Sequence, residues 1–128
     1  MVMTRESLDQ SICIFSYDRI FSHLLAGILR GHFLIIIVHN PKSMVKHIER
    51  EEMKLLLGDS ALLDGSVISA LCNSRAIHYG MPHVLLFLSP VEVQSVDARY
   101  QPCIDKILFK PAGTEEIITA VLEMTTQG

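Results

Sequence analysis

The chain has 128 residues, of which 49% are hydrophobic and 20% charged, and this length suits about one domain. Its longest apolar runs, residues 33–38 and 84–88, are far too short to span a bilayer, so a membrane-spanning segment is not expected. The net charge of -3 gives no support for nucleic-acid binding, and the acidic, polar start of the chain is unlike a secretory signal.

The three cysteines, Cys13, Cys72 and Cys103, are odd in number and far apart along the chain. They fit neither a disulfide framework nor a paired zinc motif, and they suggest a reducing, cytosolic setting. Cys13 and Cys72 fall at core positions of their predicted elements, so we expect both to pack as small apolar side chains. The expected localisation is therefore cytoplasmic.

Five short apolar runs, rich in leucine and β-branched residues, predict strands buried on both faces. They lie at residues 12–15, 33–38, 55–57, 84–88 and 104–109. Residues 1–10 are expected to be frayed, residues 11–125 to form a single domain, and residues 126–128 to be a tail.

Helical periodicity separates these runs. The first predicted helix covers residues 19–30, and its expected buried stripe is Ile20, Phe21, Leu24, Leu25, Ile28 and Leu29. Shorter helices are expected after Pro41 and after the turn at residues 64–66, and an irregular helix at residues 91–100. Thr114 is predicted to cap the last helix. The residues of this last helix that are expected to face inward are Ile117, Ile118, Val121 and Leu122.

Strands that alternate with helices predict an α/β domain with a parallel sheet and helices on both faces. The best-populated small arrangement is the flavodoxin-like three-layer sandwich with strand order 2-1-3-4-5. In that order the strand ends bring Asp18, Asp59, Ser89 and Lys110 to one edge of the sheet. An acid, a hydroxyl and an amine would meet there, where open α/β sheets bind ligands.

Three sequence motifs carry a resemblance to a known family. They are Leu-Leu-Leu-Gly-Asp59 with Asp64-Gly65 after it, Leu-Ser89 after an apolar strand, and Leu-Phe-Lys110-Pro111 before an amphipathic helix. With these motifs, residues 11–124 resemble the CheY-like receiver domain of two-component response regulators. The resemblance implies that Asp59 accepts a phosphoryl group from a histidine kinase, while Ser89 and Lys110 bind the phosphoryl oxygens.

The sequence departs from the receiver pattern where an acidic pair should hold a magnesium ion. Ser16 and Tyr17 occupy those positions, so at most Asp18 and Asp59 remain as weak Mg²⁺ ligands, and no other cofactor is expected. Asp18 fits an N-cap of the first helix equally well. Ile107 replaces the aromatic residue that would switch in a typical receiver. The chain therefore resembles an atypical receiver, or pseudo-receiver, in which Lys110 could also pair with Asp59 and hold the site shut.

The leading hypothesis is a non-enzymatic signalling domain that regulates an output domain beyond Gly128 or a separate partner. It would act through phosphorylation at Asp59 or through phosphate-independent protein contact, and its expected partner is a histidine kinase or another signalling protein. The alternative is a flavodoxin-like module for flavin or cobalamin, although no Ser, Thr and Gly run follows the first strand.

Receivers also pair through the face of the fourth helix, fifth strand and fifth helix. We therefore predict a weak homodimer through that face, which would carry Asp105, Lys106, Glu115, Glu116 and Glu123.

Overall fold

The fold is seen in a computed structural model, which describes residues 11–40, 42–44, 46, 53–59, 69–73, 82–91 and 100–126. Within these ranges five parallel strands form one sheet in the order β2-β1-β3-β4-β5, as predicted. The strands are β1 (Ser11–Phe15), β2 (Leu34–Val38), β3 (Met53–Asp59), β4 (His83–Leu88) and β5 (Lys106–Phe109).

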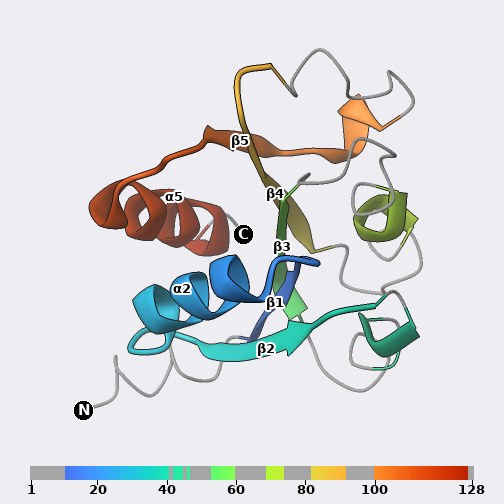
Figure 1. Cartoon of the computed structure of the whole chain (residues 1–128), viewed down its shortest axis with the longest axis horizontal. Coiled ribbons are helices and arrows are strands. Elements are labelled where there is room, and N and C mark those ends of the chain that lie inside the picture. Colours follow the sequence, from blue (N-terminus) through green and yellow to red (C-terminus); the bar gives the residue numbers. More distant parts are fainter. Residues whose placement is uncertain are drawn as a thin grey trace.

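Helices cover both faces of the sheet, which gives the expected three layers (Figure 1). Helices α2 (Arg19–Leu29) and α5 (Thr114–Thr126) lie on one face, and the helical residues 42–44, 46 and 69–73 lie on the other. Successive strand residues point to opposite faces, so Ile12 and Ile14 join the core under α2 and α5, whereas Cys13 and Phe15 join the second core. Burial on both faces explains why the three central strands, β1, β3 and β4, are mostly apolar, whereas the edge strands β2 and β5 are only partly buried.

The strand register aligns the carboxyl ends of the strands. Phe15 lies opposite Val38 and Gly58, Asp59 lies opposite Phe87, and Leu88 lies opposite Phe109. The residues that end or follow these strands therefore meet at one edge, which is where the candidate site lies.

The buried stripe of α2 differs from the prediction. Ile20 is 83% exposed and Leu24 58% exposed, while Ser22 and Ala26 are buried beside Leu25. The small side chains of Ser22 and Ala26 face the sheet, and at 100° per residue Ile20 and Leu24 then fall on the opposite side of the helix. Hydrophobicity alone misplaced the stripe because it ignores these small residues.

The ends of the last two elements also differ from the prediction. Helix α5 already includes Thr114, so Gly113 precedes the helix, and the Gly113 N–H donates to the Glu116 carboxylate at 3.4 Å. Leu122 is 37% exposed rather than inward-facing. Strand β5 starts at Lys106, two residues after its predicted start, because a 3₁₀ turn, η2 (Gln101–Cys103), and its capping residue come first.

The expectation of unpaired cysteines is wrong for two of the three. Cys72 and Cys103 form a disulfide although they are 31 residues apart in sequence, because their Cα atoms lie 5.8 Å apart in the fold. Cys13 is free and buried, as predicted. The cysteine count therefore no longer argues for a reducing compartment.

Several predictions lie outside the described residues: the frayed residues 1–10, the turn at residues 64–66, most of the irregular helix at residues 91–100, and Gln127 and Gly128. Among the described helices, none has both the length and the apolar composition needed to cross a membrane.

Candidate functional site

The centre of the candidate site is the carboxylate of Asp59, the last residue of β3. Only 1% of Asp59 is exposed, and each of its carboxylate oxygens has a protein partner. The Ser16 hydroxyl donates to Oδ1 at 2.5 Å, and the Lys110 ammonium donates to Oδ2 at 3.1 Å. The expected approach of Lys110 to Asp59 is therefore found, together with a partner that the sequence did not suggest.

Ser16 follows β1 directly and is fully buried. Its Oγ also accepts the Asp18 backbone N–H at 3.0 Å, and its carbonyl oxygen lies 3.2 Å from Nδ1 of His39, the residue after β2. Because a carbonyl oxygen only accepts, that contact is a hydrogen bond when the Nδ1 of His39 carries the proton. These bonds hold Ser16 in place against Asp59. The sequence signals for this role were its position at a strand end and its place where the receiver pattern has an acidic residue.

Lys110, the residue after β5, lies between the Asp59 carboxylate and an aromatic ring. Its Nζ is 5.0 Å from the ring centroid of Phe21, which in turn packs edge-on against Phe87 at 5.3 Å. The ammonium thus combines an ion pair with a cation–π contact. Helix α2 and strands β3, β4 and β5 together fix its position.

The other two predicted residues contribute differently. Ser89 follows β4 at the same edge of the sheet and is half-buried. Asp18 uses its carboxylate as the N-cap of α2, where it accepts the Phe21 N–H at 3.1 Å. Asp18 was considered as a weak Mg²⁺ ligand or as a helix N-cap, and in the structure it has the geometry of an N-cap.

The oxygen atoms at this edge of the sheet are poorly suited as ligands of a magnesium ion. Magnesium prefers oxygen ligands in near-octahedral geometry, yet the Ser16 hydroxyl is bonded to Asp59 and an Asp18 oxygen caps α2. The Tyr17 ring packs edge-on against Phe15 at 5.3 Å. Across the described part of the chain, no three or more His, Cys, Asp or Glu side chains gather in a way that could hold a metal ion.

This geometry limits the chemistry of Asp59. A carboxylate that attacks phosphorus must present an oxygen lone pair to the reagent. Each oxygen of the Asp59 carboxylate already accepts a hydrogen bond, and the residue is buried. A phosphorus reagent would therefore meet a buried carboxylate whose two oxygens already have partners.

Comparisons with known proteins identify the fold. No family model and no curated protein matches the sequence. Among solved structures, the N-terminal signal receiver domain of a two-component response regulator from Bacteroides fragilis is 15% identical, with a TM-score of 0.79, over 93% of this chain and 99% of that one. A CheY-like response regulator receiver domain from Methylobacillus flagellatus is 14% identical, with a TM-score of 0.76, over 92% and 99%.

A response regulator receiver modulated diguanylate cyclase from Pelobacter carbinolicus is 18% identical, with a TM-score of 0.71, over 90% of this chain and 91% of that one. At these identities the likeness is one of fold. The chain has the fold of CheY-like response regulator receiver domains.

Proposed function

We propose that this domain is a receiver-type signalling module that regulates an attached output domain or a separate partner through protein contact, without phosphorylation of Asp59 as its main switch. The receiver fold and the Asp59–Lys110 pair support the signalling class. The Pelobacter carbinolicus structure, described as a receiver modulated cyclase, is an example of such a fold in a regulated enzyme.

The observation that carries the proposal is the closed network around Asp59. Its two carboxylate oxygens are bonded to Ser16 and Lys110, and the residue is 1% exposed. In a phosphoacceptor site the lysine and a metal ion would neutralise the charge that builds on the phosphoryl oxygens. Here Lys110 already neutralises Asp59, and the place of one acidic metal ligand is taken by Ser16.

Magnesium binding by this domain is proposed to be weak. With Asp18 and Asp59 as the only carboxylates considered, a hard and strongly hydrated cation has few ligands to replace its water. Without the ion, phosphoryl transfer to Asp59 would be slow, because only Lys110 and backbone donors would stabilise the transferring group.

The test is a magnesium titration of the ¹⁵N-labelled domain, with and without beryllofluoride, a phosphoryl mimic. We expect weak binding and shifts confined to the neighbourhood of Asp59. Tight, saturable binding at sub-millimolar magnesium, with beryllofluoride shifts that spread through β5 into α5, would overturn the proposal.

The double variant Ser16→Asp, Tyr17→Asp is the matched control. It restores the acidic pair and removes the hydroxyl that bonds to Asp59. Four carboxylates near one edge, in place of two, should bind magnesium more tightly than the wild type does. Equal affinity would show that the end of β1 does not correspond to the acidic pair of receivers.

A further inference from the structure

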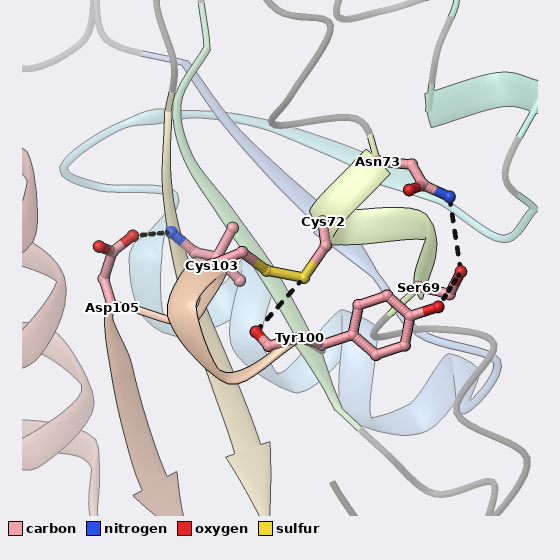
Figure 2. Close-up of a disulfide and its surroundings, with 7 residues drawn as sticks. Ser69, Cys72, Asn73, Tyr100, Cys103 and Asp105 are labelled. Carbon is pink, nitrogen blue, oxygen red and sulfur yellow. Dashed lines mark hydrogen bonds between the residues drawn. A yellow bond between two sulfur atoms is a disulfide. The ribbon is translucent and has the colours of Figure 1, made fainter. Parts of the chain in front are cut away.

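The disulfide joins two segments that the fold brings together on the face of the sheet opposite α2 and α5. Cys72 lies in the helical residues 69–73, and Cys103 ends η2 (Figure 2). Cys72 belongs to the second core, whereas the α2 side chain Phe21 packs against the other core. Cys103 precedes β5 and Lys110 follows it, so the disulfide and the Asp59 site lie at opposite ends of that strand.

Other bonds hold the same region independently of the disulfide. The Tyr100 carbonyl accepts the Cys103 N–H at 3.0 Å, which closes the turn of η2. Asp105 and Val84 join the start of β5 to β4 through two hydrogen bonds, of 2.9 and 2.8 Å. The Tyr100 hydroxyl also donates to the Ser69 hydroxyl at 3.3 Å, which links η2 to the helical segment (Figure 2). These contacts should keep the two cysteines close together after reduction.

The environment of the sulfur atoms suits reversible exchange. Cys103 is half-buried and Cys72 is 9% exposed, so Cys103 is the more accessible of the two cysteines to an external thiol. A reduced Cys72 thiol finds an acceptor in the Tyr100 carbonyl, 3.9 Å from its Sγ. Cys13 differs from both: it is fully buried and burial raises its pKa to about 12, so it forms too little thiolate to compete.

We propose that Cys72 and Cys103 form a reversible thiol–disulfide site, which exchanges with a low-molecular-weight thiol–disulfide couple and controls how firmly residues 69–73 are held against η2. This proposal goes beyond the function proposed above, because it adds a redox input on the opposite face from Asp59. The exchange at this disulfide does not involve the Asp59 network.

The exchange is balanced. In reduction, the thiolate of a small thiol attacks Cys103 Sγ, the disulfide bond breaks, and Cys72 leaves as a thiolate that takes up a proton. A second small thiolate attacks the mixed disulfide, which releases Cys103 and forms the small-molecule disulfide. Two electrons and two protons pass from two small thiols to the cysteine pair, and oxidation is the reverse.

The experiment equilibrates the intact domain in glutathione buffers that run from fully reduced to fully oxidised. Alkylation and mass spectrometry then count the thiols. We expect two additional alkylated cysteines at the reduced end, a reversible transition, and a reduced protein that keeps a folded amide spectrum. A disulfide that stays closed in the folded protein at the reduced end would overturn the proposal, because resistance to the glutathione pool is typical of structural disulfides. Loss of the fold on reduction would overturn it equally.

The amide spectrum gives a second readout. We expect shifts on reduction to centre on residues 69–73 and 100–105, with the signals of Asp59 and Lys110 unchanged. Shifts that reach Asp59 would contradict the separation of the disulfide from the Asp59 site. Because this readout does not involve magnesium, it can fail without affecting the function proposed above.

Two variants complete the design. Cys13→Ala is the matched control, and its exchange with glutathione should follow the same transition as the wild type. The double variant Cys72→Ser, Cys103→Ser should show no transition and should have the amide spectrum of the reduced wild type. A transition that disappears in Cys13→Ala would mean that Cys13 is the exchanging residue, and the proposal would be wrong.

Discussion

At the scale of single residues, the burial of Asp59 determines what its partners must do. A carboxylate that is 1% exposed loses its hydration, and this cost is offset only if both oxygens are bonded. Ser16 and Lys110 supply those bonds from the ends of two other strands. Asp59 therefore stabilises the fold only as part of this group, and the removal of one partner should be costly.

We predict that Lys110→Met lowers the free energy of unfolding by about 3 kcal/mol, because it leaves the buried Asp59 without its cationic partner. Lys106→Met is the matched control. Lys106 lies 4.0 Å from Glu123, and the two side chains are 38% and 61% exposed, so its loss should cost less than about 0.5 kcal/mol. Urea denaturation at neutral pH measures both values.

The double variant Lys110→Met, Asp59→Asn extends this test. With the carboxylate also removed, most of the lost stability should return, because no charge is left buried without a partner. If Lys110→Met costs no more than Lys106→Met, the buried pair does not contribute to stability in the way described.

At the scale of elements, the strands could be predicted from sequence and the helix faces only in part. A strand buried on both faces is recognisable from composition alone, and each of the five predicted runs overlaps an observed strand. The orientation of α2 depends on which side chains fit against the sheet. Ser22 and Ala26 fit there because they are small, and the sequence stripe had placed Ile20 and Leu24 on that side instead.

The candidate site, like the helix faces, could be predicted from the sequence only in part. Parallel topology brings strand ends together, so the approach of Lys110 to Asp59 followed from the strand order. The bond from Ser16 did not follow, because it depends on the rotamer of a side chain whose type gave no signal. The Cys72–Cys103 disulfide could not be predicted either, because sequence spacing does not show that residues 69–73 meet η2.

Asp18 provides a test at the start of α2, where its carboxylate accepts the Phe21 N–H. We predict that Asp18→Ala lowers the free energy of unfolding by about 1 kcal/mol, while Asp18→Asn changes it by only a few tenths, because asparagine also caps helices. Urea denaturation should give the same losses in EDTA and in magnesium. A loss that appears only with magnesium would identify Asp18 as a metal ligand instead.

At the scale of the whole molecule, the sheet separates two chemically different sides. Asp59, Lys110 and Phe21 gather on the side of α2 and α5, and the disulfide lies on the other side. Strand β5 connects them, with η2 before it and Lys110 after it. Its pairing with β4 starts with the backbone bond between Asp105 and Val84, which lies between the disulfide and Lys110 along the chain.

Cys13 links the stability of the whole sheet to pH, because it lies in β1 between β2 and β3 and its thiol reaches water only when the sheet opens. Burial raises its pKa from an ordinary value of 9.0 to about 12. Between these values the native state keeps a proton that the unfolded chain has lost, so the free energy of unfolding falls as the pH rises. We predict that Cys13 accounts for a loss of about 2 kcal/mol between pH 8 and roughly pH 10.5.

Urea denaturation of the disulfide-intact protein should therefore show a steeper alkaline loss for the wild type than for Cys13→Ala, which has no thiol to ionise. Parallel pH profiles for the two proteins would mean that the Cys13 thiolate is tolerated in the native sheet.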